Sequence, residues 1–455
     1  MTASVKQFRQ TAFIAVEDVR LQTALEGATG RFHSARTVAI AELPDADAMR
    51  DHFKTIRANT LANLAEHLET FERNSIANGS NVHWARDASE AQKIVLDIAK
   101  AYGVELVAKS KSMATEEIHL NHALKNAGII PIETDLGEWI VQLAGEPPSH
   151  IIAPAIHKTK EQVADLFTRE AGQTVPADIP TLTAEARRML REKFLAAGMG
   201  ISGGNLGVAE TGSIVLVTNE GNGRMVTSLP PVHVAVMGIE KIAPTWDEAT
   251  VWLSLLARSA TGQPLSIYTS IVTGPARNTD TDGPNDPDGP REVHIILLDN
   301  GRSKLIGTTY EEILQCIRCG ACLNVCPVYR EAGGHAYGSP YSGPIGAVIS
   351  PLLFGLEHYA GLPQASSLCG ACKDVCPVRI DLPRMLVELR GEEVQRGLLP
   401  WWEAAAERGA AAVLGNETLM RVAAGFGRVG QGFVGGNLPR LAKKSFRKLW
   451  EEGEV

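Results

Sequence analysis

Apolar residues recur at the spacing of a helix face in two stretches of the first hundred residues, 51–71 and 88–101. This spacing places the apolar side chains on one face and predicts two amphipathic helices. Residues 1 to about 50 are more weakly periodic, with charged residues scattered among short apolar pieces. They yield no functional prediction.

From residue 104 onward, short β-rich runs alternate with helical patterns. The runs lie at 104–108, 129–132, 151–156, 213–217, 232–236, 266–272 and 293–298. Helices are expected at 113–127 and 183–197, and a capping box formed by Thr159 and Gln162 begins another. Alternating strands and crossover helices predict an α/β domain whose sheet is largely parallel, at least in its first half.

Composition narrows the classes of protein that fit this pattern. The net charge of −8 and a pI near 5.9 argue against a protein that binds the phosphate backbone of nucleic acid. Residues 1–16 lack the apolar core and cleavage site of a signal peptide. The longest apolar run, 345–356, contains a serine and a proline and is shorter than the roughly 20 residues of a membrane helix. We therefore expect a cytoplasmic protein that is not an integral membrane protein.

All seven cysteines lie between residues 316 and 376, in two copies of one motif. The first copy consists of Cys316, Cys319, Cys322, Cys326 and Pro327. The second consists of Ser366, Cys369, Cys372, Cys376 and Pro377. The odd number of cysteines fits metal ligands in a reducing compartment better than it fits a set of disulfides. The spacing is the one by which a short peptide wraps an iron–sulfur cluster and lends its last cysteine to a neighbouring cluster.

Exchange of the last cysteines, as in two-cluster ferredoxins, assigns the ligands. The first cluster, of the 4Fe-4S type, would be held by Cys316, Cys319, Cys322 and Cys376. The second would be held by Cys326, Cys369 and Cys372. Its fourth position is occupied by Ser366. Three outcomes stay open: a seryl oxygen or another non-cysteine group completes a 4Fe-4S cluster, one iron is left open, or the cluster is of the 3Fe-4S type.

Zinc is the alternative metal, because it also binds closely spaced cysteines. One zinc ion takes four ligands, whereas seven thiolates with two Cys-Pro endings favour exchange between two clusters. Two adjacent clusters transfer single electrons between partners and hold no substrate of their own.

In the predicted α/β domain, two sets of residues are candidates for binding a ligand. Lys109, Lys111 and Ser112 follow a predicted strand, where open α/β sheets bind ligands, and two cations beside a hydroxyl suit a carboxylate or phosphate. Glu210 and Thr211 follow the glycine-rich stretch 198–207 and are candidates for lining a pocket. The alternatives are a solvated loop for the first set and a simple turn for the second.

An acidic cluster in the same domain also has two interpretations. Glu133, Asp135 and Glu138, with His150 and His157 nearby in the chain, could serve as a general base or metal ligands. Surface charge and helix capping explain the same residues. A strand, a glycine-rich turn and a helix do not occur in the order of a dinucleotide fingerprint, so neither flavin nor nicotinamide is expected.

Several further segments, together with both cysteine motifs, resemble the lactate utilisation protein B family. They are Lys109-Ser-Lys-Ser-Met113, Glu116-Glu-Ile-His-Leu-Asn121, Glu133-Thr-Asp-Leu-Gly-Glu138, Pro148-Ser-His150, Pro154-Ala-Ile-His157, Ala209-Glu-Thr-Gly212, Asp299-Asn-Gly-Arg302 and Gly333-Gly-His-Ala-Tyr-Gly338. The resemblance implies a lactate-utilisation domain, similar in fold to sugar-phosphate isomerase and CoA-transferase-like α/β proteins, followed by a mainly helical dicluster ferredoxin domain. It also implies partner subunits in a system that oxidises L-lactate to pyruvate.

These observations divide the chain into four expected parts. They are an N-terminal helical segment (1–60), the lactate-utilisation domain (61–303), the 4Fe-4S ferredoxin-type domain (304–396) and a C-terminal helical extension (397–455). We expect a subunit, without assigned catalytic residues, that passes electrons from a partner subunit through two clusters to a further carrier. The alternative is a small-acid-binding or catalytic front domain whose clusters are regulatory or structural.

Overall fold

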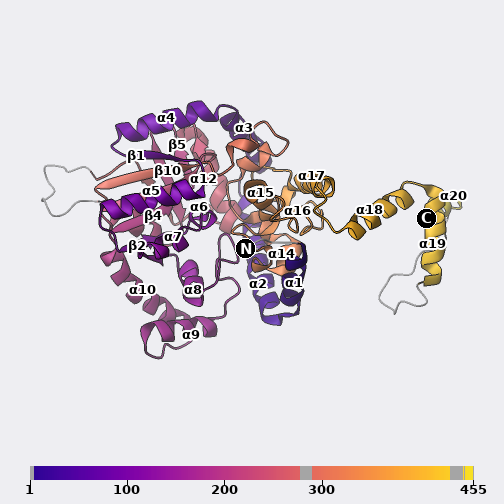
Figure 1. Cartoon of the computed structure of the whole chain (residues 1–455), viewed down its shortest axis with the longest axis horizontal. Coiled ribbons are helices and arrows are strands. Elements are labelled where there is room, and N and C mark those ends of the chain that lie inside the picture. The colour runs from indigo at the N-terminus through magenta and orange to yellow at the C-terminus, as the bar shows by residue number, and fades with distance from the viewer. Residues whose placement is uncertain (1–4, 277–288, 431–443, 445, 454–455) are drawn as a thin grey trace. The chain divides into compact units, whose positions relative to one another are not determined.

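The structure, a computed structural model, describes residues 5–276, 289–430, 444 and 446–453. It consists of two compact units, 1–390 and 391–455 (Figure 1). The first unit contains all strands of the described chain and all seven cysteines. In the described part of the second unit the elements are the end of α17 (Leu382–Gln395), α18 (Trp401–Leu414), α19 (Glu417–Gly430) and α20 (Phe446–Glu451).

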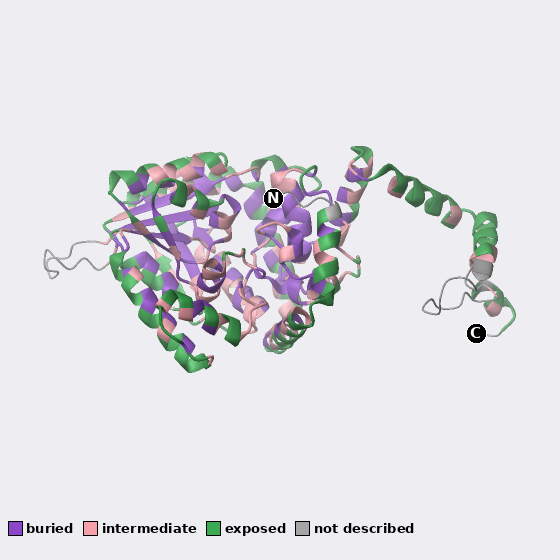
Figure 2. Cartoon of the chain, turned by 60° about the horizontal axis from the view of Figure 1, so that its bottom comes forward, coloured by how far each residue is buried: buried purple, intermediate pink, exposed green. Residues whose placement is uncertain are grey.

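A six-stranded parallel sheet forms the centre of the first unit. In spatial order its strands are β1 (Asn81–Ala85), β10 (Glu292–Leu298), β7 (Val232–Gly238), β4 (Met199–Gly203), β2 (Leu106–Lys109) and β3 (Ile130–Glu133). Every neighbouring pair is parallel. All seven residues of β7 are buried, as expected of a parallel strand covered on both faces (Figure 2). The predicted α/β domain with a parallel sheet is confirmed.

Helices cover the two faces of this sheet with separate apolar cores. Val107 of β2 belongs to the core that also contains residues of α5 (Ala88–Ala101) and α7 (Leu120–Asn126). Its neighbour Ala108 belongs to the other core. That core contains residues of α8 (Leu136–Ala144), α9 (Lys160–Ala171) and α10 (Ile179–Ala196). Because successive residues of a strand face opposite sides, the two cores lie on opposite faces.

A smaller sheet extends the domain. It contains β8 (Ile242–Ala243), β5 (Leu206–Val208), β6 (Ser213–Thr218) and β9 (Tyr268–Val272) in that order. β6 pairs antiparallel with β5 and β9, and β5 pairs parallel with β8. Helices α11 (Asn222–Ser228) and α12 (Trp246–Thr261) follow β6 and β8 in the chain.

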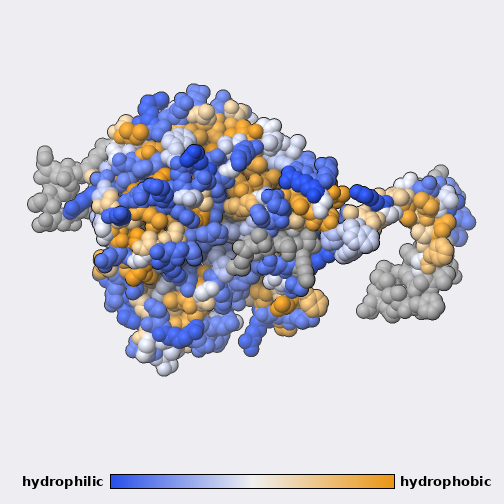
Figure 3. Space-filling model, viewed as in Figure 1, coloured by the Kyte–Doolittle hydropathy of each residue, from blue (hydrophilic) through white to orange (hydrophobic). Residues whose placement is uncertain are grey.

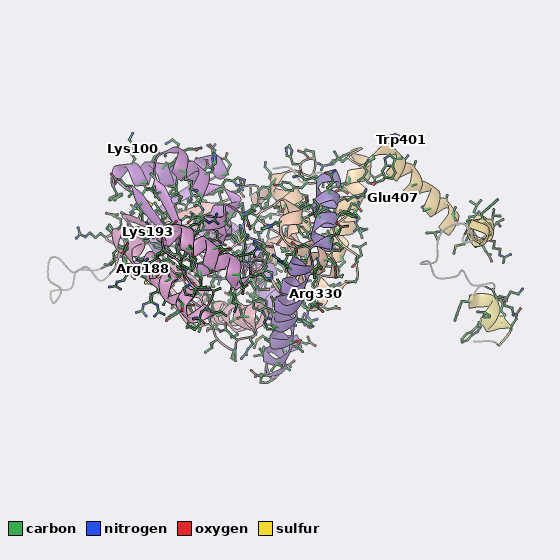
Figure 4. All side chains as sticks on the ribbon, turned by 90° about the horizontal axis from the view of Figure 1, so that it is seen from below. Lys100, Arg188, Lys193, Arg330, Trp401 and Glu407 are labelled. Carbon is green, nitrogen blue, oxygen red and sulfur yellow. The ribbon has the colours of Figure 1, made fainter. Side chains whose placement is uncertain are left out.

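Short helices carry the cysteine segment, and the first three helices of the chain lie against it. The cysteine segment contains η1 (Ser303–Leu305), η2 (Glu311–Gln315), α13 (Ala321–Asn324), α14 (Pro327–Ala332), η3 (His335–Tyr337), α15 (Gly343–Phe354) and α16 (Ala371–Asp374). Of α1 (Val5–Glu17), α2 (Val19–Ala41) and α3 (Ala46–Ala62), α2 contacts both α13 and α14 (Figure 1). Arg330 of α14 donates to the hydroxyl of Thr29 of α2 at 2.9 Å (Figure 4).

Several sequence predictions for individual elements need correction. The predicted strand at 151–156 is a series of turns, in which the His150 ring accepts hydrogen bonds from the backbone of Ile152 and Ala153. Those two N–H groups are therefore not available for strand pairing. The predicted helix at 51–71 divides at Asn63 into α3 and α4 (Leu64–Ala77). The glycine-rich stretch 198–207 contains β4 and the start of β5, which were not predicted because its glycines indicated a turn.

Other helix predictions were closer. The capping box of Thr159 and Gln162 is present at the start of α9. The helix predicted at 113–127 is interrupted at His119, whose φ of 50° separates α6 (Met113–Glu117) from α7. The stretch 274–290, whose density of glycine, proline, aspartate and asparagine predicts a long surface loop, falls largely outside the described residues.

In the second unit, the described helices expose apolar side chains. Trp401, Leu414, Leu419 and Phe426 are all exposed. Figure 3 shows apolar surface, in orange, among these helices. Trp401 is labelled in Figure 4. Among the described residues, none of the helices has both the length and the apolar character needed to cross a membrane.

Candidate functional site

The two cysteine motifs have the same local backbone. Arg318 and Leu368, which precede the second cysteine position of each copy, are both left-handed, with φ of 58° and 55°. Gly320 and Gly370, which follow it, are also left-handed and cap the four-residue helices α13 and α16. The duplication seen in the sequence is therefore a duplication of structure.

Ser366 occupies the same place in this repeat as Cys316. The backbone N–H of Arg318 donates to the sulfur of Cys316 at 3.4 Å. In the second copy, the N–H of Leu368 donates to the hydroxyl of Ser366 at 3.1 Å. The side-chain oxygen of Ser366 thus stands where the first copy has a sulfur.

The thiols fall into two groups by their electrostatic effects on one another. Burial, with contributions from the nearby Cys376 and Cys316, raises the pKa of Cys319 to about 12. Burial likewise raises the pKa of Cys372 to about 12, with contributions from Cys326 and Cys369. We call Cys316, Cys319, Cys322 and Cys376 the first thiol group, and Cys326, Cys369 and Cys372 the second thiol group.

The two groups are adjacent, and each contains cysteines from both copies of the motif. Burial raises the pKa of Cys322, and the three other members of its group contribute to the rise. Cys372 of the second group contributes as well. Cys326, from the first copy of the motif, belongs to the second thiol group, and Cys376, from the second copy, belongs to the first thiol group. Neither copy therefore forms a complete site alone.

The spacing of the sulfurs distinguishes between zinc and a larger cluster. Four sulfurs around one zinc ion, with Zn–S bonds of about 2.3 Å, lie roughly 3.8 Å apart. Among the described residues, which include all seven cysteines, no three thiols have sulfurs all within 4.8 Å of one another. As they stand here, no three of the seven sulfurs are therefore close enough together to bind one zinc ion.

Basic side chains from α2 and α3 bind the backbone of the two chain segments that form the first thiol group. Arg36 of α2 donates to the carbonyl of Val375 at 2.7 Å. Arg50 of α3 donates to the carbonyl of Cys376 at 2.8 Å, and Arg57 donates to that of Leu314 at 3.1 Å. All three arginines are buried. Together they hold both chain segments that contribute to the first thiol group.

These arginines were missed by the sequence analysis. Arg50 and Arg57 lie on the same face of α3 as buried Phe53, at helical spacing of three, four and seven residues. An arginine on the apolar face of a predicted helix is the sequence signal that could have identified these residues. A buried arginine needs carbonyl or carboxylate partners, which here come from a distant part of the chain.

A buried network of charges connects the sheet to the cysteine segment. Arg302 binds Glu117 of α6 at 2.7 and 2.8 Å and Glu240, which follows β7, at 2.7 Å. The hydroxyl of Tyr341 donates to Glu117 at 2.6 Å. Burial alone raises the pKa of Glu240, but Arg302 and Lys241 outweigh it and hold that pKa at about 2. Both carboxylates are thus charged at neutral pH and bind Arg302.

A cavity of about 300 Å³ lies at the carboxyl end of the six-stranded sheet. Lys111 and Ser112, two of the predicted ligand-binding residues, line it. Lys109 does not, because its ammonium is buried and bound to Glu133 at 2.5 Å. Cys319 also lines the cavity, so that it extends from the sheet to the first thiol group.

The remaining sequence candidates have structural roles. The backbone carbonyls of Glu210 and Thr211 accept hydrogen bonds from Asn74 of α4 and from Asn78, which follows that helix, and neither Glu210 nor Thr211 lines the cavity. Asp135 caps α8 by accepting from the N–H of Glu138, as the capping interpretation predicted. Burial lowers the pKa of His150 to about 3, and the ring binds the amide oxygen of Asn324 at 3.1 Å.

His157 is part of a second polar cluster between the sheet domain and the cysteine segment. Its Nε2 lies 2.7 Å from Glu146, which also binds Lys158 at 2.5 Å. The ring of His335 lies 4.6 Å from that of His157. The ammonium of Lys158 already neutralises the carboxylate, so this cluster is an ion-pair contact.

Comparison with known proteins agrees with this division of the chain. The LUD domain family matches residues 68–298, and the 4Fe-4S dicluster domain family matches residues 312–380. A protein named Lactate utilization protein B from Bacillus licheniformis is 45% identical over 397 residues, which cover 87% of this chain and 82% of that protein. The protein of that name from Macrococcus caseolyticus is 47% identical over 384 residues, covering 84% and 79%.

A third relative of that name, from a Geobacillus species, is 48% identical over 377 residues, which cover 83% of this chain and 78% of the relative. A solved structure of a DUF162 family protein from Deinococcus radiodurans is 14% identical and covers 52% of this chain and 98% of that chain. Its TM-score of 0.28 is too low to bear on the fold.

Proposed function

Because the chain belongs to the lactate utilization protein B family, we propose that it is the iron–sulfur electron-transfer subunit of a system that oxidises L-lactate to pyruvate. The carrying observation is the pair of adjacent thiol groups, each assembled from both copies of the motif. When bound, the clusters supply one-electron oxidation and reduction. Electrons from a partner subunit pass through them to a further carrier.

In this proposal the first thiol group holds a 4Fe-4S cluster with all four of its cysteines. The second thiol group holds a 4Fe-4S or 3Fe-4S cluster. The position of Ser366 in the repeat supports its oxygen as the fourth ligand of a 4Fe-4S cluster. The buried arginines of α2 and α3 fix the loops of the first thiol group and place positive charge near a cluster that carries negative charge.

Three finer assignments belong to the same proposal. The domain limits are 1–60, 61–303, 304–396 and 397–455, and the cysteine-bearing domain is mainly helical. The front domain has the fold of sugar-phosphate isomerase and CoA-transferase-like proteins, which its parallel sheet with helices on both faces supports. The protein works in the cytoplasm, where a reducing environment suits seven free cysteines.

The cavity favours a second candidate function, in which the front domain binds or converts a small acid and the clusters regulate or stabilise it. The two functions differ in whether the clusters carry electrons. Anaerobically purified complex is mixed with L-lactate, and reduction of the clusters is followed by EPR. Reduction by L-lactate that requires the partner subunits supports electron transfer. Clusters that stay oxidised under these conditions, while lactate is consumed, contradict it.

A further inference from the structure

Part of the second unit carries a charge opposite in sign to that of the chain as a whole. The stretch 418–450 contains seven lysine and arginine residues and no aspartate or glutamate, whereas the net charge of the whole chain is −8. The rest of the chain is therefore strongly acidic. A negatively charged surface would attract this basic stretch and repel the remainder of the protein.

Helix α19, which begins this stretch, has one apolar face. Leu419, Val422 and Phe426 follow one another at intervals of three and four residues, which places them on the same side of the helix. Their side chains are 46%, 52% and 76% exposed. Arg421 lies on the opposite side and pairs with Glu417 at 2.7 Å. In the part of the chain that the structure describes, the apolar face of α19 is therefore exposed along its length.

The neighbouring helices expose aromatic side chains. Trp401 and Trp402 are exposed at the start of α18, a helix in which no described residue is buried (Figure 2). In α20, Phe446 and Trp450 are both exposed, and their rings lie 6.0 Å apart. The side chain of Lys448, between them in the chain, is also exposed. Tryptophan and lysine each combine an apolar body with a polar tip, which suits a boundary between an apolar phase and water.

This composition fits a lipid surface better than it fits a protein partner. Lysine is depleted at protein–protein interfaces. Helices that lie on membranes combine lysine and arginine on a polar face with tryptophan, phenylalanine and leucine on the other. Anionic lipids supply the negative charge that complements the stretch 418–450.

Two of the basic residues already have acidic partners in the chain. Arg421 pairs with Glu417, and Lys444 pairs with Glu452 at 2.5 Å. Both pairs lie at the surface, where an ion pair contributes little. The two cations can therefore exchange these partners for lipid headgroups at small cost.

We propose that the second unit docks the protein on the surface of a membrane that contains anionic lipids. The exposed apolar residues of α18, α19 and α20 enter the boundary between headgroups and acyl chains, and the basic residues of 418–450 contact the headgroups. This peripheral attachment does not rest on the electron transfer proposed above.

The experiment uses the anaerobically purified full chain with its clusters and measures its flotation with lipid vesicles. One set of vesicles contains equal parts of phosphatidylglycerol and phosphatidylcholine, and the other contains phosphatidylcholine alone. We expect the chain to bind the anionic vesicles about tenfold or more tightly than the neutral ones. Added salt is expected to weaken this binding, because it screens the attraction between the basic residues and the headgroups.

Phe426→Asp tests the apolar face of α19. The variant removes an apolar contact and adds a negative charge, so we expect it to weaken binding to the anionic vesicles by about tenfold or more. Leu195→Asp is the matched control, because Leu195 is 65% exposed on α10 of the first unit. This control is expected to bind as the wild type does. Iron content and circular dichroism verify that both variants are folded.

A pair of lysine replacements tests the charge. Lys444→Gln combined with Lys448→Gln removes two cations of the basic stretch, and we expect about tenfold or more weaker binding. The control combines Lys100→Gln with Lys125→Gln, which changes the net charge equally. Lys100 (Figure 4) and Lys125 are exposed on α5 and α7 of the first unit. The control pair is expected to leave binding unchanged.

Several results overturn the inference. They are equal binding to both sets of vesicles, wild-type binding by Phe426→Asp, an equal loss in the two lysine pairs, and no flotation with the anionic vesicles. Dimers in sedimentation that Phe426→Asp abolishes, without any vesicle binding, would identify a second copy of the chain as the partner instead. If the clusters accept electrons in the complex but no vesicle binds, only this inference fails. If vesicles bind and the clusters never take electrons, only the proposed electron transfer fails.

Discussion

The first and second thiol groups share a backbone but differ in their surroundings. Helices α2 and α3 cover the first group, and buried Arg36, Arg50 and Arg57 bind its two chain segments. In the second group Cys369 is exposed. The main effects on the pKa of Cys369, which is lowered, are hydrogen bonds from the backbone of Ala371 and the side chain of Ser367. Two motifs with the same backbone conformation therefore form two sites with different surroundings.

The difference has a consequence for electron transfer. Reduction adds negative charge to a cluster, so nearby cations favour the reduced state, while burial alone disfavours it. The first thiol group has the nearby cations, whereas the second, although Cys326 and Cys372 are buried, includes the exposed Cys369. We expect the exposed second group to exchange electrons with a partner protein, and the enclosed first group to be tuned by its arginines.

Loss of a cysteine is expected to have the largest effect, and an unequal one. Cys319→Ala removes about four iron atoms per chain, and Cys372→Ala removes about three or four. The first variant also leaves buried arginines facing an empty site, which costs about 3 kcal/mol or more of stability. Iron analysis and urea unfolding measure both effects. Equal destabilisation by the two variants would contradict the contrast between the groups.

Ser366→Cys makes the two groups equal in their ligands. If the second group holds a 3Fe-4S cluster, the variant raises iron from about seven to about eight per chain. If Ser366 oxygen already completes a 4Fe-4S cluster, iron stays at about eight and the potential of the second cluster shifts. In both cases the EPR signal of the first cluster is unchanged. A change confined to the first cluster would show that the ligands are assigned to the wrong groups.

Arg36→Gln tests the effect of charge on the first group, since glutamine can keep the hydrogen bond to Val375. Loss of one positive charge is expected to lower the reduction potential of the first cluster by on the order of 50–100 mV, for an effective dielectric constant near 20. The second cluster keeps its potential. Arg188→Gln is the control, because Arg188 is half exposed on α10 (Figure 4). Equal shifts in the reduction potentials of both clusters would contradict the difference between the two thiol groups.

Lys54→Met is expected to have the smallest effect. Lys54 binds Glu312 at 2.7 Å, but its side chain is 41% exposed. Exposed ion pairs contribute about 1 kcal/mol or less to stability. Urea unfolding should show a change within that range and potentiometry no shift in either cluster. A loss of stability as large as that of Cys319→Ala would mean that the packing of α2 and α3 on the first thiol group depends on surface charge.

What the sequence could predict was set by local pattern. The cysteine spacing, the parallel sheet and the capping box at Thr159 are encoded within a few residues, and each was found in the structure. The role of Arg36 and Arg50 was not foreseen, because their partners lie more than 300 residues away. The strand expected at 151–156 failed for a similar reason: His150 binds the backbone there, which apolar pattern alone does not show.

Only part of the candidate ligand site was foreseen. The rule that ligands bind after strands selected Lys111 and Ser112, which line the cavity, but equally selected Lys109, which is bound to Glu133. Lys109 is the last residue of β2, whereas Lys111 lies in the loop after it, and a single sequence does not say where the strand ends. Arg318, which lies between Cys316 and Cys319, also lines the cavity and was not singled out in the sequence.

The most direct test is a redox titration of the anaerobically purified chain, followed by EPR, with iron and sulfide measured on the same sample. The account predicts two reversible one-electron steps, about seven or eight iron atoms per chain, and magnetic interaction between the two centres when both are reduced. Colourless protein that contains zinc, without sulfide and without a reducible centre, would contradict it.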